Sequence, residues 1–358
     1  TRTDTLFPYT TLFRSTVNTM YRRLFFLLII FHSLSIFGQT LIRMNSQHSF
    51  QKDVPKGNYS GLTWLGGERY AIVSDKAPQS GFFIFRIQID SINGDIINIR
   101  TEGFRSSGVK NHDEEDIAFF PKDSTVFISR ESDNKIMEYS LVGQLTGREL
   151  LIPPVFNDAT TQYGFEALTY NKMTHRFWST SESTLKGDGK QADSKNSVRN
   201  KLRIQSFNDS LQPMEQYIYL MDTPKSHASA SVFAMGVPAI VALDNAKLLI
   251  LEREFAVKPG KIGSYVINKI YAVDPSTEEP IHMDLPLPST PPYMKKHLIV
   301  EWKTSLSLFR QDLANYEGMC LGPKLVDGNQ VIILCADSQD QYKGILQDWF
   351  KTIVISPK

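Results

Sequence analysis

The sequence has few of the residues that most often carry metal or nucleophilic chemistry. Its 358 residues include two cysteines and seven histidines, and they form no C-x-x-C or H-E-x-x-H pattern. A G-x-S-x-G motif is absent, and the "GDGK" stretch at Gly187 lacks the spacing and the preceding strand of a phosphate-binding loop. These absences argue against a common zinc, dithiol, serine hydrolase or P-loop site.

An excess of charge of one sign is also missing. The chain has 39 basic and 38 acidic residues and a formal net charge of +1, which argues against nucleic acid as its partner. The apolar stretch Leu24–Phe37 is shorter than the ~20 residues that a spanning helix needs, and His32, Ser33 and Ser35 interrupt it. We therefore expect no stable membrane span.

Two N-terminal segments are predicted to lie outside the folded domain. Residues 1–19 have no clear helical or strand period and precede Met20, so we expect them to be a non-native leader. Because no cysteine follows directly after the apolar stretch, a bacterial lipoprotein is disfavoured.

The pattern after this leader is typical of a secretory signal peptide. Arg22 and Arg23 precede the apolar stretch, and a small residue, Gly38, follows it. This pattern predicts a signal peptide over residues 20–38, cleavage near Gly38, and a secreted or periplasmic domain of residues 39–358.

One β pattern is repeated along the chain, whereas helical periodicity is hard to find. Each repeat has a small or acidic residue, a short apolar strand, a polar turn, and a second strand that ends in an acid. The repeats are Ser60–Asp75, Glu115–Glu131, Glu166–Glu182, Pro238–Glu252 and Glu317–Asp337.

Short strands that recur in this way are typical of a β-propeller. We expect an all-β chain with a single propeller of five or six blades, each a four-stranded antiparallel sheet. The alternative, a pair of β-sandwiches, does not require the same hairpin five times. The polar stretch 186–200 is predicted to be a mobile loop.

The acids of each repeat are predicted to meet at one end of a hairpin. Glu115 and Glu131 have the same separation as Glu166 and Glu182, so each pair is expected to lie opposite or nearly opposite. Like charges placed opposite each other destabilise a hairpin unless a cation, a shared proton or an arginine compensates them.

These strand ends would gather around one mouth of the propeller channel and form an acidic rim. Oxygen ligands without nearby histidines favour calcium or magnesium over zinc, so calcium is the predicted cofactor. A purely structural rim, paired with Lys and Arg of adjacent blades, is the alternative. The predicted metal ligands are Asp75, Asp113, Glu115, Glu131, Glu166, Glu182, Glu252, Glu317 and Asp337.

Four stretches in order resemble the phytase-like family described as having esterase-like activity of phytase. They are "DEEDIAF" at Asp113–Phe119, "GFEAL" at Gly164–Leu168, "LLILEREF" at Leu248–Phe255 and "NYEGMCL" at Asn315–Leu321. The resemblance implies a propeller that hydrolyses ester or phosphate-ester bonds.

The combined hypothesis is an exported, calcium-dependent hydrolase that acts on a small-molecule ester or phosphate ester at the acidic channel mouth. The alternative is a non-catalytic propeller that binds a ligand or partner on the same face, with structural calcium. The candidate catalytic residues are Glu115, Glu166 and Glu317, and the candidate substrate contacts are Arg253, Arg130 and Lys269.

Five further residues have chemistry that the hypothesis does not use. Cys320 and Cys335 are symmetric about the turn "VDGN", so they are either cross-strand partners in a disulfide or buried free thiols. His112 is interpreted as a loop residue rather than a proton carrier. Trp64 and Trp178 lie in predicted strands and are expected in the core.

Overall fold

The computed structural model describes residues 38–159, 164–225, 230–309, 311–340 and 342–356. The predicted leader, 1–19, and all of the predicted signal peptide except Gly38 lie outside the described residues. The described part forms 21 β-strands and four short 3₁₀ helices, and it contains no α-helix. None of its helices is long and apolar enough to cross a membrane.

The strands follow one another along the chain with short connections. Their bounds are β1 Leu41–Met44, β2 His48–Ser49, β3 Tyr59–Gly66, β4 Arg69–Ser74, β5 Gln79–Ile89, β6 Ile96–Lys110, β7 Glu114–Phe120, β8 Thr125–Arg130, β9 Lys135–Ser140, β10 Leu145–Glu149, β11 Phe165–Asn171, β12 Arg176–Ser181, β13 Lys201–Asn208, β14 Pro213–Leu220, β15 Val232–Ala242, β16 Leu248–Val257, β17 Tyr265–Val273, β18 Lys296–Ser305, β19 Asn315–Lys324, β20 Gln330–Asp337 and β21 Trp349–Ile355. The 3₁₀ helices are η1 Pro154–Asp158, η2 Lys186–Asp188, η3 Pro275–Thr277 and η4 Tyr342–Gly344.

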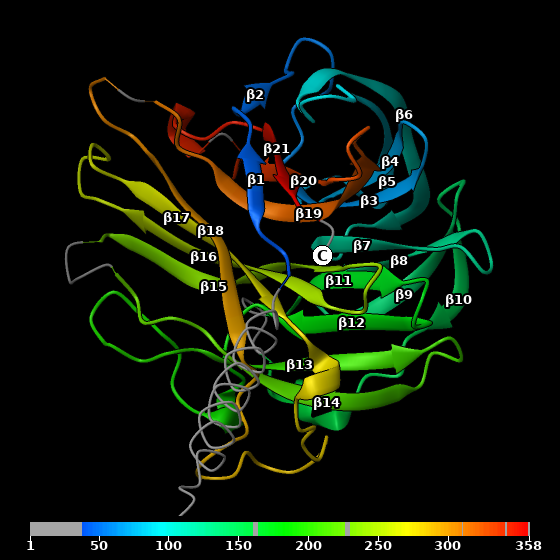
Figure 1. The fold of residues 1–358 in the computed structure, drawn as a ribbon, viewed down its shortest axis with the longest axis vertical. Helices are drawn as coiled ribbons and strands as arrows, with labels where there is room; N and C mark the ends of the chain where they lie inside the picture. The colour runs from blue at the N-terminus through cyan, green and yellow to red at the C-terminus, as the bar shows by residue number, and fades with distance from the viewer. Residues whose placement is uncertain (1–37, 160–163, 226–229, 310, 341, 357–358) are drawn as a thin grey trace, which may run out of the picture. The chain divides into compact units, whose positions relative to one another are not determined.

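These strands form five antiparallel sheets, which confirms the all-β propeller and sets its number of blades at five. Blade 1 is β3–β6, blade 2 is β7–β10, blade 3 is β11–β14 and blade 4 is β15–β18, each in chain order. Blade 5 has the order β19, β20, β21, β1, and β2 also pairs with β21. Figure 1 shows the blades following one another around the ring as the colour changes from blue to red.

The ring is closed by strands from opposite ends of the chain. β1 pairs antiparallel with β21, with Leu41 opposite Ile355 and Met44 opposite Ile353; in Figure 1 the blue β1 lies beside the red β21. The first strands of the blades, β3, β7, β11, β15 and β19, each contact the next one, and β19 contacts β3. These five inner strands therefore surround the central channel.

The five repeated segments are the two innermost strands of the five blades, as the sequence pattern predicted. In each blade a tight turn with at least one residue at positive φ joins the two strands. Glycine adopts this conformation at little cost, whereas other residues adopt it less readily. The turn residues are Gly67 (φ 57°), Ser124 (φ 54°), His175 (φ 54°), Ala246 (φ 69°) and Gly328 (φ 84°).

The hydrophobic core is divided among the contacts between neighbouring blades. Tyr59 and Phe85 of blade 1 share a cluster with Ile333 and Phe350 of blade 5, and each other pair of adjacent blades has its own cluster. Burial of each large apolar side chain contributes about 1.5–3 kcal/mol. The inner strands are therefore held rigidly on both sides.

Both tryptophans singled out from the sequence pack in these clusters. Trp178 is buried between blades 3 and 4, as predicted. Trp64 is partly buried against the cluster of blades 1 and 5, and its Nε1 donates to the carbonyl of Gly67 at 2.8 Å.

The cysteines are free thiols and not a disulfide. In the pairing of β19 with β20, Cys320 lies opposite Ile333 and Cys335 lies opposite Gly318. The symmetry about the turn in the sequence is not the symmetry of the hairpin, because register shifts displace the two strands.

The segment 186–200, predicted to be a mobile loop, is anchored to blade 3. The carboxylate of Asp188 in η2 accepts from Nε (2.6 Å) and Nη2 (2.7 Å) of Arg203, a fully buried residue of β13. Asn200, also buried, donates from Nδ2 to the carbonyl of Met235 at 2.7 Å. Some polar residues of this segment therefore form a buried ion pair and buried hydrogen bonds, while others contact solvent.

Candidate functional site

The site begins with an irregularity that all five inner strands share. Near its start each of these strands has a register shift against the second strand of its blade. A β-bulge frees a side chain from the regular alternation and turns it in a new direction. The bulges include Ser60, Glu115, Glu166, Pro238 and Glu317.

The second strand of each blade contributes one charged residue beside the bulge. In blades 2 and 3, the amides of Glu131 and Glu182 donate to the carbonyls of Asp113 (2.8 Å) and Gly164 (3.0 Å), just before the inner strands. The equivalent residues of the five blades are Asp75, Glu131, Glu182, Arg253 and Asp337.

Seven of the bulge and second-strand residues are carboxylic acids, and we call these seven the acidic cluster. Each is electrostatically linked to at least one other member. Its members are Asp75, Glu115, Glu131, Glu166, Glu182, Glu317 and Asp337, and Arg253 lies among them.

The bulges shift the register of the acids that were predicted to lie opposite or nearly opposite each other. Glu131 pairs through its amide with Asp113, and in the ladder Arg130 lies opposite Glu114. Glu115 is therefore not the register partner of Glu131. Its side chain nevertheless comes close to that of Glu131, because the bulge redirects it.

Three carboxylates approach one another as the ligands of a cation do. One oxygen each of Glu115, Glu131 and Glu166 lies within 4.8 Å of the other two. Glu115 and Glu166 are each only 8% exposed, and the described residues offer neither carboxylate a hydrogen bond or ion pair. Glu131 accepts one hydrogen bond, from the amide of Gly164 at 3.2 Å.

Burial raises the pKa of all three side chains, and repulsion from neighbouring carboxylates raises it further. The pKa of Glu131 rises to about 7, and those of Glu115 and Glu166 lie well above their ordinary value. Without a cation, this part of the cluster is therefore unfavourable in its fully ionised form at neutral pH.

Arg253 provides an internal positive charge on the other side of the cluster. Its terminal nitrogens donate to Glu182 and Glu317, and Nη1 also donates to Oδ1 of Asn315 at 2.9 Å. Burial acts to lower the pKa of Arg253, but the carboxylates around it outweigh burial and raise it. The predicted substrate contact is thus already committed to two buried carboxylates.

Asp75 and Lys76 lie where the cluster approaches the surface. Lys76 Nζ is 2.6 Å from Oδ2 of Asp75 and 3.7 Å from Oδ1 of the half-exposed Asp113. The other oxygen of Asp75, Oδ1, is buried and has no hydrogen-bond partner among the described residues. Burial raises the pKa of Asp75 to about 6, although the ion pair with Lys76 opposes this.

Glu252 lies outside the cluster, although it was predicted to be a ligand. Arg253, and not Glu252, pairs with Gly236 at the equivalent position of blade 4. Since successive side chains of a strand point to opposite faces, Glu252 faces the other way. There it accepts from the hydroxyl of Tyr219 at 2.7 Å and from Lys296 at 2.5 Å.

The other two predicted substrate contacts are also placed elsewhere. Lys269 of blade 4 pairs with Asp222, which follows β14 of blade 3, in the same polar group as Glu252. Arg130 donates from Nε to Asp133 at 3.1 Å. His112 likewise lies with its Nδ1 3.7 Å from Asp133, which agrees with its interpretation as a loop residue.

A cleft of about 510 Å³ lies near Asp75 and Asp337, although neither residue lines it. Its lining includes Ser74 and Lys76, the chain neighbours of Asp75, and Ser338, the neighbour of Asp337. Neither this cleft nor Lys76 was predicted from the sequence, where the only signal is the pair Asp75–Lys76 at the end of a repeat.

The opposite ends of the inner strands have a different character. A cavity of about 640 Å³ there is lined mainly by apolar side chains such as Leu62, Ile117, Leu168 and Met319. One channel mouth is therefore acidic and the other apolar, and a cation would be favoured only at the first.

The chain is similar to several solved structures, at low sequence identity. A streptogramin B lyase is 13% identical, with a TM-score of 0.38 and coverage of 86% of this chain and 97% of that one. A luciferin-regenerating enzyme is 7% identical, with a TM-score of 0.40 and coverage of 87% and 97%. The PQQ domain of a pyranose dehydrogenase from Coprinopsis cinerea is 9% identical, with a TM-score of 0.38 and coverage of 86% and 97%. Similarity at this level carries no information about the chemistry of this chain.

No curated protein matches the sequence. A family model does match, over residues 54–339, which include the inner strands of all five blades and the whole acidic cluster. Its description is phytase-like, esterase-like activity of phytase. The chain therefore belongs to this phytase-like family.

Proposed function

We propose that this protein is an exported, calcium-dependent hydrolase of phosphate esters whose active site is the acidic cluster and the cleft beside it. One observation carries the proposal: the carboxylates of Glu115, Glu131 and Glu166 converge within 4.8 Å, and the described residues offer no hydrogen bond or ion pair to two of them, which are buried. Membership of the phytase-like family supports the reaction class.

The residues present fit calcium better than a transition metal. The converging donors are carboxylate oxygens, which suit calcium or magnesium. Buried carboxylates with raised pKa values are stabilised by a divalent charge. Oδ1 of Asp75 is a further buried oxygen, and it has no hydrogen-bond partner within the part of the chain that the structure describes. Glu115, Glu131 and Glu166 would hold the ion. When bound, it supplies positive charge to the phosphate and acidifies a nearby water.

The other residues have separate tasks in this proposal. Arg253 fixes Glu182 and Glu317 and opposes the burial that raises their pKa values. Lys76, at the edge of the cleft, contacts the phosphate. Asp75, whose pKa of about 6 leaves it ionised above neutral pH, accepts the proton of the attacking water.

The reaction is then a simple hydrolysis. A water oxygen bonds to phosphorus as the ester P–O bond breaks, one proton of the water passes to Asp75, and the leaving oxygen becomes a hydroxyl group by taking up a proton. Replacement of Asp75 by asparagine should lower kcat by roughly 10²–10⁴, the usual contribution of a general base.

The test combines stability and turnover. Calcium at ~100 times its dissociation constant should stabilise the native protein by about 2.7 kcal/mol, whereas chelator should abolish both this effect and phosphate release. Glu166→Gln should lose both responses, and the exposed Glu279→Gln should keep them. If calcium changes neither stability nor turnover, the proposed function is wrong.

The alternative, a non-catalytic binding propeller with structural calcium, gives a different result. Calcium would then stabilise the protein, but no phosphate ester would be hydrolysed, and Glu166→Gln would change ligand affinity only through stability. Export is tested separately, by N-terminal sequencing of protein from the exported fraction, which should begin near Gly38.

A further inference from the structure

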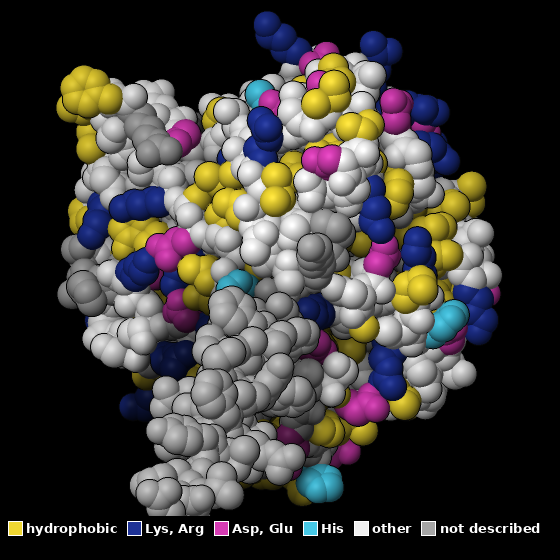
Figure 2. All heavy atoms as spheres, viewed as in Figure 1, with side chains coloured by type: hydrophobic (Ala, Val, Ile, Leu, Met, Phe, Trp, Pro, Cys, Tyr) yellow, Lys and Arg dark blue, Asp and Glu magenta, His cyan; other side chains and the backbone are white. Residues whose placement is uncertain are grey.

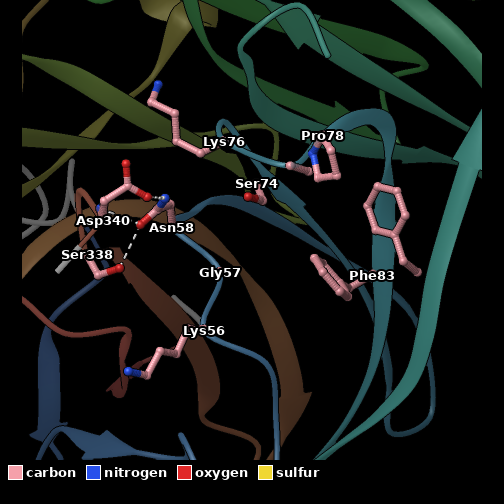
Figure 3. A pocket seen from close by; sticks show the side chains of 11 residues that line it. Lys56, Gly57, Asn58, Ser74, Lys76, Pro78, Phe83, Ser338 and Asp340 are labelled. Atoms are coloured by element: carbon pink, nitrogen blue, oxygen red, sulfur yellow. Dashed lines mark hydrogen bonds between the residues drawn. The ribbon is translucent and has the colours of Figure 1, made fainter. Parts of the chain in front are cut away.

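The cleft beside the acidic cluster has walls of two kinds. Phe83 of β5 and Phe104 of β6 form an apolar wall together with Pro78, and Asn58, Ser338 and Asp340 form a polar one. In Figure 3, Phe83 and Pro78 lie on one side and the polar residues on the other, with Lys76 and Lys56 at opposite ends.

The aromatic wall is held in place before any ligand binds. The rings of Phe83 and Phe104 are 4.9 Å apart, and Phe83 packs edge-on against Tyr59, which is fully buried, at 5.9 Å. Phe83 and Phe104 remain partly exposed. Rings fixed in this way offer a flat apolar surface without losing side-chain freedom on binding.

The polar wall is equally rigid. The side chain of Asn58 donates from Nδ2 to Asp340 at 2.8 Å and accepts from the hydroxyl of Ser338 at 2.7 Å. The backbone amide of Asn58 donates to Asp348 at 3.0 Å. These contacts, drawn in part as dashed lines in Figure 3, join the start of blade 1 to blade 5.

The positive charge of the cleft is small and mostly compensated. Lys76 pairs with Asp75, and Lys56 is close enough to Asp348 to oppose the raised pKa of that carboxyl. Asp340 adds a negative charge to the lining. On the face drawn in Figure 2, basic and acidic side chains of the described residues are likewise interspersed.

A ligand with many phosphates needs many uncompensated cations, and this cleft does not provide them. We propose that the cleft selects phosphomonoesters that carry one phosphate on an aromatic group, with the ring against Phe83 and Phe104 and the phosphate toward Lys76 and the acidic cluster. This inference rests on the proposed function for the position of the phosphate.

The chemistry of such a substrate suits the site. Cleavage of the P–O bond releases a phenol, whose pKa is near 10, so the leaving oxygen departs more readily than that of an aliphatic alcohol. The proton of the attacking water passes to Asp75, and the phenolate takes a proton from solvent. The atoms balance as aryl phosphate and water giving phenol and inorganic phosphate.

The test measures binding independently of turnover. Phenylphosphonate, methylphosphonate and inositol hexakisphosphate are titrated by calorimetry, with calcium and with chelator. We expect phenylphosphonate to bind about tenfold more tightly than either other ligand. Phe104→Ala should weaken phenylphosphonate binding about tenfold and leave methylphosphonate binding unchanged, whereas Phe309→Ala, at a position that is 99% exposed, should change neither.

The outcomes separate this inference from the proposed function. Tighter binding of inositol hexakisphosphate, or equal effects of Phe104→Ala on both phosphonates, would overturn the inference even if calcium-dependent turnover is found. Selective phenylphosphonate binding without turnover would support the inference while refuting the proposed hydrolase. A Phe104→Leu variant retains apolar bulk and should recover part of the binding, which guards against a general loss of folding.

Discussion

Replacement of Glu131 by glutamine is predicted to change stability in opposite directions with and without calcium. Burial and the charges around it raise the pKa of Glu131 from 4.5 to about 7. A carboxyl with a raised pKa favours folding below its unfolded pKa, and this contribution is lost as the pH rises through the folded value. Ionised Glu131 therefore opposes folding above pH ~7.

The size of the effect follows from the shift. A change of one pKa unit corresponds to 1.36 kcal/mol, so the shift of Glu131 from 4.5 to about 7 amounts to about 3 kcal/mol. This is an upper value, because the side chain is partly exposed. Glutamine has the same shape as glutamate without the charge. In chelator, Glu131→Gln should therefore be more stable than the parent by roughly 1–3 kcal/mol at pH ~8, and as stable as the parent at pH ~4.

Calcium should reverse the order. The parent gains about 2.7 kcal/mol at ~100 times its dissociation constant, which raises the melting temperature by about 5 °C for a domain of this size. The variant loses one ligand oxygen with its charge and should gain little. The assay is urea unfolding at both pH values, with Glu279→Gln as the matched control.

One result would refute the reasoning directly. If Glu131→Gln in chelator is less stable than the parent at pH ~8, the carboxylate is stabilised in the native state without a cation. The convergence of Glu115, Glu131 and Glu166 would then be satisfied by protons or by contacts with Arg and Lys.

Three further predictions concern groups away from the convergent carboxylates. Arg253→Met should destabilise the protein by about 3–5 kcal/mol, since it leaves Glu182 and Glu317 buried without their cation. Urea unfolding should show a smaller loss of stability at pH ~5 than at pH ~8, and a loss of stability independent of pH would contradict the ion-pair assignment. Asp188→Asn should cost a similar amount by leaving Arg203 uncompensated, and limited proteolysis should then cut within 186–200; an uncut variant would show that other contacts anchor the segment. The two thiols should react with a thiol reagent only after denaturation, because both are buried and burial raises their pKa values; reaction in the native protein would show that their blade opens.

The sequence predicted the fold because the signal for each blade is local. Alternating strands, a polar turn and an acid at the strand end recur in five segments, and each became the inner hairpin of one blade. The choice between five and six blades was beyond the sequence, because the insertions in blades 3 and 4 obscure the repeat length. Closure by β1 and β21 joins residues too far apart in sequence for any local pattern to reveal.

The acidic cluster was predicted in part for the same reason. Most members of the acidic cluster end a second strand or begin an inner one, which the repeat shows. Glu252 was misplaced because a slip of one residue exchanges the faces of a strand, and the bulges that set the true register leave no clear mark in the sequence. The ion pairs of Arg253 and Lys269 join residues of different strands and blades, so these pairs became visible only in the structure.

The pairing of β1 with β21 also sets the order in which the protein can acquire its site during synthesis. β1 is the first described strand to leave the ribosome, and its partner is the last. Blades 1 to 4 can form on the growing chain, but Glu317 and Asp337 are fixed beside the other acids only when the final blade is complete. Contacts of such long sequence separation form slowly. The acidic cluster is therefore complete only after the ring has closed, although Glu115, Glu131 and Glu166 of blades 2 and 3 can converge earlier.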